Sequence, residues 1–370
     1  MPEWNRTTVG EVITLQRGFD ITKSQQNPGD VPVVSSGGIG SYHDTAMVKG
    51  PGVVMGRKGT LGKVFYLEGD YWPHDTTLWV KDFKGNDRRF VYYFLGTLDF
   101  LSMDVGTSNP TLNRNHVHPV PIDWPLLKEQ EGIAAVLGAL DDKIDVNERI
   151  ATTVDELAST TYLHSVVNSR IPEEVLLGEV AAVNVETLKP SKEGNIRYID
   201  ISSVGVGSYE WPDMIPWSDA PGRARRKAKF GSTIWSTVRP NRRSHALVMD
   251  EDSDLVFSTG LAVLTPLTVG PATFYEATST AEFQTYLEGV AEGSAYPAVR
   301  AERFKEAPLL LPDAAMRDAF ERTAMPMRRR AHQATLESRT LAALRDTLLP
   351  QLMSGRLRVK DAEKIVEEAT

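Results

Sequence analysis

The hydrophobic positions of this chain follow two different periods in alternating segments. Residues 1–125 and 170–312 contain short apolar runs separated by glycine, proline and polar residues, a pattern that predicts strands joined by turns. Residues 126–169 and 313–357 instead repeat apolar side chains at steps of three and four, which predicts long amphipathic helices. The pattern therefore predicts an α+β chain of two globular mixed α/β units and two long helices, followed by a C-terminal tail over 358–370.

The helix predicted over 126–169 carries an apolar stripe for about forty residues, which gives a rod of roughly 60 Å. That length exceeds the radius of a single domain. Asn147 falls at the heptad position that Leu140 and Val154 share. A buried amide at such a position commonly fixes the register of paired helices; a polar residue on the exposed face is the alternative. The stripe consists of Ile133, Leu140, Asn147, Ile150, Val154 and Leu157.

The second helix, predicted over 313–357, places Leu341, Leu344, Leu348 and Leu352 on one face. Pro326 interrupts this segment. Because proline removes one helical hydrogen bond, we expect the helix to bend there or to begin only afterwards. Two helices that each end one globular unit can pair with each other, so we expect an antiparallel coiled coil that separates and bridges the two units.

The two globular units are copies of one another. The opening "TVGEVITL" at Thr8–Leu15 is echoed by "LLGEVAAV" at Leu176–Val183, and "VVMGRKGTLGKVFY" at Val53–Tyr66 finds its counterpart in "STIWSTVRPNRRSHALVM" at Ser232–Met249. Both members of the second pair predict a strand, a basic turn and another strand. The second copy has lost the glycines of the turn but keeps its cations, which favours a loop that meets a nucleic acid through charged side chains.

A nucleotide-binding P-loop is the alternative for the first basic turn, and the spacing excludes it. The motif requires G-x-x-x-x-G-K-[ST], whereas Gly56 lies one residue too far from Gly62, and Val64 replaces the hydroxyl residue. A P-loop must also open a helix, while "VFYLEG" has the aromatic and β-branched character of a strand.

Composition and charge narrow the class of protein. At 370 residues the chain is long for one core, so two domains are expected. The absence of cysteine excludes disulfides and thiolate metal sites. No signal peptide or membrane-spanning run occurs, so we expect a cytoplasmic protein. The formal net charge of −8 argues against nonspecific coating of nucleic acid, but basic patches at Arg223–Lys229 and Arg239–Arg243 allow local docking.

Five motifs occur in a fixed order along the chain. They are the paired GEV openings, "SSGGIGSYHD" followed by "GRKGTLGKV", "HDTTLWV" at His74–Val80, "LGALDDKIDVNERI" at Leu137–Ile150 and "LRDTLLPQLMSGRL" at Leu344–Leu357. Each motif alone is weak, but their order, their duplication and the long helices between them are together specific. In these features the chain resembles the specificity subunits of type I restriction-modification systems across nearly its whole length.

The resemblance implies that residues 1–125 and 170–312 are target-recognition domains, each reading one half of a bipartite asymmetric site in double-stranded DNA. It implies that the helices set the spacing of the half-sites and dock two modification subunits, which methylate adenine with S-adenosylmethionine. A restriction subunit, which translocates and cuts DNA with ATP and Mg²⁺, is implied as an optional further partner. The chain itself is then expected to be non-catalytic and to hold no cofactor.

Sequence readout needs side chains that reach base edges and cations that fix the register on phosphates. Each unit is therefore expected to use its basic turn together with a second segment, which ends in Asn113 and Arg114 or in Arg300, the expected counterpart of Arg114. A buried structural ion pair is the alternative for these two arginines. The expected DNA-binding residues are Arg57, Lys58, Thr60, Lys63, Asn113, Arg114, Arg239, Asn241, Arg242, Arg243 and Arg300.

No catalytic or metal site is predicted. The tetrapeptide of an adenine methyltransferase has its nearest approach in "SNPTL" at Ser108, and His116 and His118 lack the partners of a metal site. The alternative function is a scaffold or adaptor of a defence complex that binds RNA or protein. The duplicated basic turn favours DNA reading, because a scaffold needs no cations at the same place in both copies.

Overall fold

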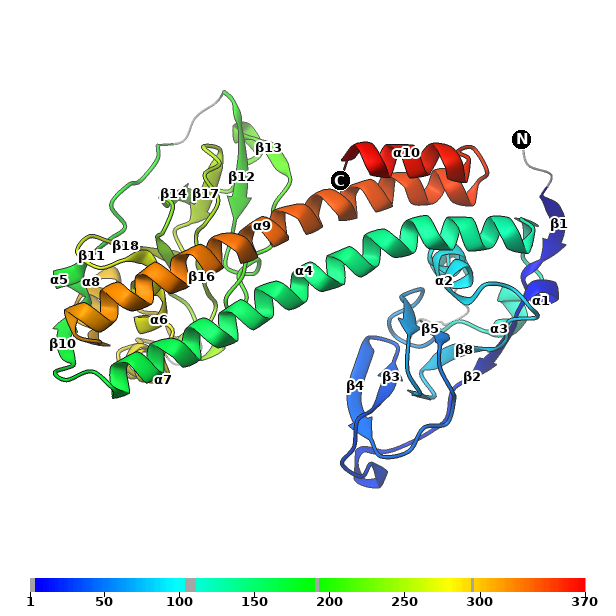
Figure 1. Cartoon of the computed structure of the whole chain (residues 1–370), viewed down its shortest axis with the longest axis horizontal. Helices are drawn as coiled ribbons and strands as arrows, with labels where there is room; N and C mark the ends of the chain where they lie inside the picture. The colour runs from blue at the N-terminus through cyan, green and yellow to red at the C-terminus, as the bar shows by residue number, and fades with distance from the viewer. Residues whose placement is uncertain (1–3, 104–110, 190–192, 294–295, 370) are drawn as a thin grey trace. The chain divides into compact units, whose positions relative to one another are not determined.

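The chain forms two compact units that share two long helices. The computed structural model describes residues 4–103, 111–189, 193–293 and 296–369. One unit consists of Met1–Asp145 with Ser338–Thr370, and the other of Val146–Glu337. Helices α4 (Leu127–Val167) and α9 (Ala314–Met353) each contribute to both units (Figure 1). Two mixed α/β domains bridged by two long helices are therefore confirmed.

The first unit is built on two small sheets and a strand pair. An antiparallel sheet has the order β2-β8-β5-β6, a second sheet has the order β4-β3-β7, and β1 pairs with β9. Its elements are β1 (Asn5–Thr8), α1 (Val9–Val12), β2 (Thr14–Arg17), β3 (Val31–Ser35), β4 (Gly38–His43), β5 (Gly52–Gly56), β6 (Val64–Leu67), β7 (Trp72–Pro73), β8 (Thr77–Asp82), α2 (Arg88–Gly96), α3 (Arg114–Val117) and β9 (Pro121–Trp124), with 3₁₀ turns at Lys23–Gln25 and Leu101–Met103.

The second unit repeats this topology and adds an edge strand, β14, to its second sheet. Its antiparallel sheet has the order β11-β18-β15-β16, its second sheet the order β13-β12-β17-β14, and β10 pairs with β19. Its elements are β10 (Glu173–Leu176), α5 (Leu177–Val180), β11 (Ala181–Val183), β12 (Asn195–Ile199), β13 (Met214–Pro216), β14 (Ala224–Arg226), β15 (Thr233–Ser236), β16 (His245–Leu247), β17 (Leu255–Ser258), β18 (Leu261–Pro266), α6 (Pro271–Ala277), α7 (Ala281–Gly289), α8 (Ala301–Lys305) and β19 (Pro308–Leu311), with 3₁₀ turns at Trp217–Asp219 and Pro240–Arg242.

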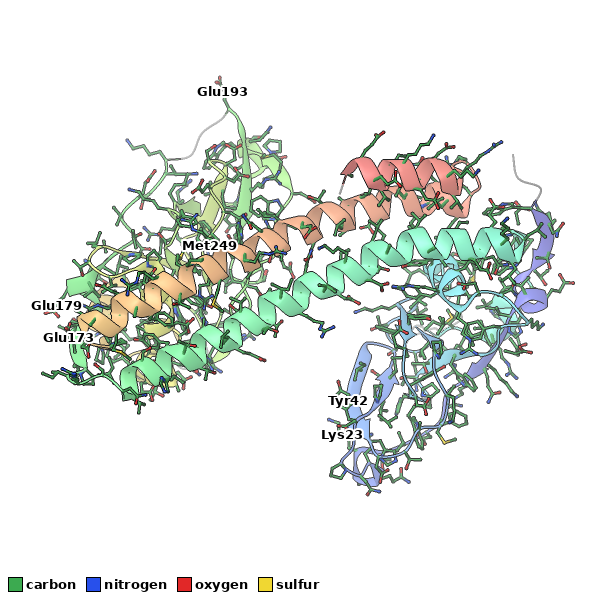
Figure 2. The ribbon with its side chains drawn as sticks, viewed as in Figure 1. Lys23, Tyr42, Glu173, Glu179, Glu193 and Met249 are labelled. Carbon is green, nitrogen blue, oxygen red and sulfur yellow. The ribbon has the colours of Figure 1, made fainter. Side chains whose placement is uncertain are left out.

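The repeated GEV motif has a structural role in both units. The Glu11 carboxylate accepts a hydrogen bond from the backbone N–H of Thr8 at 3.0 Å, and the Glu179 carboxylate (Figure 2) accepts one from that of Leu176 at 2.9 Å. Each glutamate thereby satisfies a donor at the start of a short helix. The motif marks the place where the first strand of each unit turns into its first helix.

In the first unit, the apolar stripes of the two long helices meet as expected. Ile133 and Leu140 of α4 share one core with Leu341, Leu348 and Leu352 of α9, and all five are at most 2% exposed. Leu344 packs against the same core and is partly buried. Residues 358–370, expected only as a tail, contain a further helix, α10 (Val359–Ala369), whose Ala362 is buried in this core.

In the second unit, the seam between the helices differs from the predicted stripe. Asn147 is 1% exposed and its Nδ2 donates to Glu337 Oε2 at 2.9 Å, so the interpretation as an exposed polar residue is wrong. Beyond Asn147 the buried positions of α4 are Ala158, Tyr162 and Ser165. The Tyr162 ring lies edge-on to Phe320 of α9 at 5.5 Å. Leu157 is 49% exposed and lies outside the seam.

Leu157 lies outside the seam because successive residues of a helix are rotated by about 100° about its axis. Leu157 directly precedes the buried Ala158, and it is therefore turned to the flank of the seam. Ile150 and Val154 are half-buried and line the same shallow apolar groove as Leu157, together with Val146 and Met327. The prediction that the stripe continues as the interhelical seam is wrong for Leu157.

The expected break at Pro326 does not occur, because α9 runs without interruption from Ala314 to Met353. Pro326 is exposed, whereas Ala324 and Arg328, two residues before and after it, are buried. Packing on both sides of the proline therefore holds the helix together where one backbone hydrogen bond is missing.

Arg328 forms a buried ionic cluster that joins three helices of the second unit. Its guanidinium bonds to Glu276 of α6, lies 3.0 Å from Asp155 Oδ1 of α4, and sits 4.5 Å from the centre of the Tyr275 ring. Arg328 and Glu276 side chains are 7% and 3% exposed, whereas Asp155 is half exposed. The cluster fixes α4 and α9 against α6.

None of the helices in the described part of the chain combines the length and the apolar character that a membrane span requires.

Replacing Arg328 by alanine leaves Glu276 buried without its cation, so we expect the unfolding free energy of the second unit to fall by about 3–5 kcal/mol. Burial raises the pKa of Glu276. The loss should therefore be largest at pH 8 and shrink towards pH 5, because the isolated carboxyl can take up a proton there. Urea unfolding of the full chain at both pH values measures the effect. A loss no larger than that of the exposed control Arg330→Ala, or one independent of pH, would contradict the assignment.

Candidate nucleic-acid interface

The basic turn of the first unit, residues 57–63, joins two antiparallel strands. Gly56 N–H donates to the Lys63 carbonyl at 2.9 Å, and Val64 begins strand β6. The turn needs glycine at two places, since Gly59 and Gly62 have φ of +81° and +74°. Because a strand and not a helix follows the turn, the segment is not a P-loop.

The basic turn of the second unit, residues 237–244, occupies the same place between β15 and β16 and is one residue longer than the first. Counted inward from the strand residues on either side of the turn, Gly59 corresponds to Arg239 and Gly62 to Arg243. These arginines keep the left-handed backbone of the glycines, with φ of +52° and +55°. A non-glycine residue in that region costs on the order of 1–3 kcal/mol, and such positions cluster at functional sites. The second unit therefore holds two arginines where the backbone favours glycine.

Four expected DNA-binding residues lie on the first basic turn. Lys58, Thr60 and Lys63 are exposed, and Lys63 Nζ lies 5.6 Å from the centre of the Phe65 ring. Arg57 is half-buried and its Nη1 donates to the Asp75 carbonyl at 3.3 Å. Burial, reinforced by the neighbouring Arg17, lowers the pKa of Arg57. Arg57 therefore braces the turn, while the other three side chains can reach a ligand.

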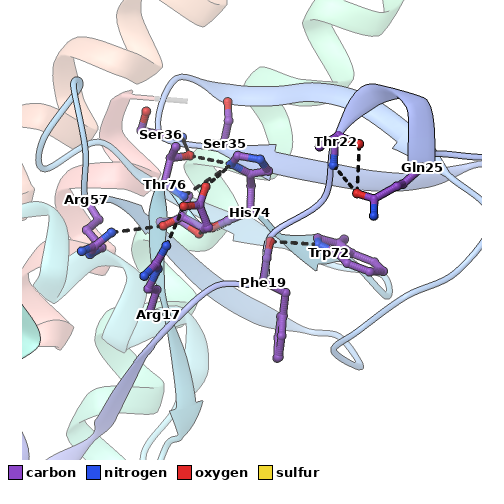
Figure 3. A network of polar contacts seen from close by, with 12 residues as sticks. Arg17, Phe19, Thr22, Gln25, Ser35, Ser36, Arg57, Trp72, His74 and Thr76 are labelled. Carbon is purple, nitrogen blue, oxygen red and sulfur yellow. Dashed lines mark hydrogen bonds and ion pairs between the residues drawn. The ribbon is translucent and has the colours of Figure 1, made fainter.

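The HDTT motif, residues 74–77, is hydrogen-bonded to the start of the first basic turn (Figure 3). The Thr76 carbonyl accepts hydrogen bonds from the N–H groups of Arg57 and Lys58 at 2.9 and 3.2 Å. Asp75 accepts from Arg17 Nη2 at 2.7 Å, and His74 Nδ1 lies 3.1 Å from both Asp75 Oδ1 and Thr76 Oγ1. The motif thus orients the turn through its backbone.

One group of potential metal ligands lies in this network. Asp20, His74 and Asp75 bring ligand atoms within 4.8 Å of one another. The Arg17 guanidinium lies 2.7 Å from the Asp75 carboxylate and supplies the opposite charge there. This donor set is therefore already engaged in an ion pair, and we assign no metal to it.

The second expected segment of each unit docks on the basic turn. Leu112 N–H donates to the Arg57 carbonyl at 2.8 Å, and Val299 N–H donates to the Thr237 carbonyl at 2.8 Å. Since Leu112 and Val299 are equivalent, Arg300 corresponds to Asn113. The pairing of Arg300 with Arg114 is therefore wrong by one residue.

The local structure supports the equivalence of Asn113 and Arg300, because each is the N-cap residue of a short helix. Asn113 Oδ1 accepts from the Asn115 N–H at 3.0 Å, while Arg114 is exposed. Arg300 is exposed and pairs with Glu292 at 2.8 Å, so neither arginine is a buried structural ion pair. Residues 106–110 of the first segment, including Ser108, and residues 294–295 of the second lie outside the described residues.

Beside the second basic turn lies a groove of about 580 Å³ that is lined by both charged and apolar side chains. The Arg239 guanidinium lies 4.8 Å from the centre of the Tyr296 ring, and Arg242 is exposed. Asn241 is exposed on the same turn but does not line the groove. The charged or aromatic residues that line the groove are Tyr198, Asp200, Arg223, Arg239, Arg242 and Tyr296.

Arg243 points back into the second unit. Its Nη2 donates to the Ser279 carbonyl at 2.8 Å, and the side chain is half-buried. Its own carbonyl lies 2.6 Å from His245 Nδ1. The side chain therefore anchors the turn, and its expected role in touching DNA finds no support in this geometry.

Sequence reasoning missed Asp200 and Tyr296 and recognised Arg223 only as part of a basic patch. Asp200 follows β12 and Arg223 precedes β14, so neither is near the basic turn in sequence. Strand pairing within the sheet brings both segments to one groove. The cation excess of "RARRKAK" at Arg223–Lys229 was the one available signal.

His245 closes the base of the second turn. Its ring stacks on Trp235 with centroids 4.6 Å apart and an interplanar angle of 7°. Burial lowers the pKa of His245 to about 4, so the ring is neutral at pH 7. The neutral ring completes the packing on which the arginine turn rests.

The fold defines a class of protein with two repeated α/β domains bridged by two long helices, and each domain carries a basic turn at the same place. Residues 1–156 match the family model of the type I restriction modification DNA specificity domain. A curated relative from Mycoplasma pneumoniae, described as a putative type I specificity subunit, is 25% identical over 145 residues, which cover 38% of this chain and 43% of the relative. The match thus spans less than half of that relative's length.

The crystal structure of the S subunit of a type I restriction-modification system from M. genitalium has the same fold. The two chains share 17% sequence identity with a TM-score of 0.63, and the alignment covers 94% of this chain and 96% of that one. The similarity to type I specificity subunits therefore consists of a family-model match over residues 1–156 and, for the chain as a whole, a shared fold.

The depressed pKa of His245 predicts a pH-dependent stability of the second unit. The unfolded chain takes up this proton near pH 6.5 and the folded chain only near pH 4. The free energy of unfolding should therefore fall as the pH drops from 6.5 to 4, by up to about 3 kcal/mol. Urea unfolding of wild type and His245→Phe across this range isolates the effect. Parallel pH profiles of the two proteins would refute it.

Proposed function

We propose that this chain is the DNA sequence-specificity subunit of a type I restriction-modification complex. One observation carries the proposal. The same basic turn recurs at the same place in both copies of the fold, and each turn is hydrogen-bonded to a second polar segment. In this proposal the two domains, over about 1–125 and 170–312, each read one half of a bipartite asymmetric site.

The electrostatics of the second unit support DNA as the ligand. Its groove is lined by three arginines and one aspartate, although the whole chain has a net charge of −8. A local excess of cations attracts the phosphate backbone, while planar guanidinium groups can also read base edges. In the first unit the exposed Lys58 and Lys63 supply the corresponding charge.

In the proposed function, the two long helices set the spacing of the half-sites and dock the partner subunits. Because α4 and α9 each belong to both units, they are suited to set the distance between the half-sites. The apolar groove of about 480 Å³ beside Ile150, Val154, Leu157 and Met327 is suited to dock a protein partner. We assign this face to a modification subunit.

The chain itself catalyses nothing in this proposal. Two modification subunits supply S-adenosylmethionine-dependent adenine methylation, and a restriction subunit supplies ATP- and Mg²⁺-dependent cleavage where it is present. A cytoplasmic location follows from work on chromosomal DNA. The competing function is an adaptor that binds RNA or protein through the same two domains.

Charge removal at exposed turn positions tests the proposal. Lys58→Ala and Arg242→Ala should each weaken binding of the complex of this chain with its modification subunits to duplex DNA. Each should also reduce the slope of log affinity against log salt concentration by about 1 per lost phosphate contact. Both side chains are exposed, so folding should be unaffected.

Lys364→Ala on α10 is the matched control, since it removes an exposed cation far along the chain from either turn. DNA affinity that stays unchanged in both turn variants would contradict the proposal. A complex that binds RNA more tightly than duplex DNA, with the same turn residues required, would establish the adaptor function.

A further inference from the structure

The groove beside the second basic turn combines side chains of opposite charge. Arg239 and Arg242 come from the turn, Arg223 precedes β14, and Asp200 follows β12. A site for phosphate alone would place no carboxylate in the groove, because the acid repels the anion. The groove therefore fits a ligand that offers both acceptors and a donor.

Arg239 is held in an orientation suited to planar recognition. Its backbone is left-handed, with φ of +52°, and its N–H donates to the Pro297 carbonyl at 2.8 Å. Its guanidinium lies over the Tyr296 ring at 4.8 Å, and Tyr296 is 70% exposed. This cation–π contact restrains the guanidinium beside the groove, where its planar set of N–H donors can meet a ligand.

Asp200 is held as an ionised acceptor. Its Oδ1 accepts from the Ser202 N–H at 2.8 Å, from Ser202 Oγ at 2.7 Å and from the Ser203 N–H at 3.2 Å. These bonds, chiefly that from the Ser202 hydroxyl, lower the pKa of Asp200. All of them end on Oδ1, so among the described residues Oδ2 remains available as an acceptor in the groove.

We propose that this groove reads a G·C base pair in the half-site of the second domain. Arg239 donates to guanine O6 and N7, and Asp200 accepts from the cytosine N4 amino group. The major-groove edge of G·C presents these acceptors and this donor side by side. The inference rests on the DNA-reading function proposed above and adds the base pair and the two residues that select it.

The first unit shows that this turn can form without a side chain at the position of Arg239. Its equivalent of Arg239 is Gly59, with φ of +81°. Arg239→Gly therefore removes the side chain and relieves the left-handed backbone, so the variant should fold. Arg239→Lys keeps the charge but loses the planar fork. Lys229→Ala, an exposed cation that does not line the groove, is the control.

The test measures affinity of the assembled complex for duplexes that carry every single base-pair change across its recognition site. We expect Arg239→Gly and Arg239→Lys to lose discrimination at one G·C pair of one half-site, by about 5- to 150-fold. Asp200→Asn should lose discrimination at the same G·C pair, because the proposal places both residues on that pair. The other positions, and all positions in Lys229→Ala, should keep their preferences.

Three other outcomes would contradict the assignment of a G·C pair to this groove. Equal weakening at every position in Arg239→Gly, restored by Arg239→Lys, identifies a phosphate contact. Unchanged discrimination in all three groove variants shows that the groove does not read bases. A wild-type complex that binds duplex DNA without sequence preference refutes the proposed function itself, whatever the variants do.

Discussion

Neither compact unit closes its core without the two long helices. In the first unit, Leu140 and Leu348 complete the core around the sheets, and in the second, Tyr162 and Phe320 do the same. Because burial of these faces is the main favourable term in folding, the helices are structural parts of both domains as well as links. Because α4 and α9 each belong to both units, a change in either helix affects both domains.

The basic turn shows what duplication kept and what it changed. In both units the turn joins the same two strands and is braced by the same hydrogen bond to its neighbouring segment. The first unit reaches the required backbone with Gly59 and Gly62, and the second reaches it with Arg239 and Arg243. The scaffold of the site is therefore constant, while the side chains offered to a ligand differ. The proposed reading of two different half-sites requires such an arrangement.

The sequence predicted the features that depend on local pattern. Periodicity located both helices, and the strand propensity after Lys63 excluded the P-loop. Pattern-based prediction failed where the position of a side chain depends on a rotation of one residue about a helix axis, or on contacts with residues far away in the sequence. Leu157 lies one residue from the seam, Arg300 is shifted by one residue from its expected counterpart, and Pro326 is tolerated because buried neighbours hold α9. Asp200 joins the groove only through strand pairing, which no single-sequence pattern reveals.

The most direct test of a specificity subunit with helix-set spacing is a genome-wide map of methylated adenines in the source organism. The map should be compared for cells with the wild-type gene, without it, and with four extra residues inserted after Asp145 in α4 and after Glu337 in α9, about one helical turn in each. We predict one split motif that vanishes on deletion and returns in the insertion strain with both half-sites unchanged and a longer gap. An unchanged map on deletion, in cells that express the wild-type chain and its modification partner, or altered half-sites on insertion, would contradict the account.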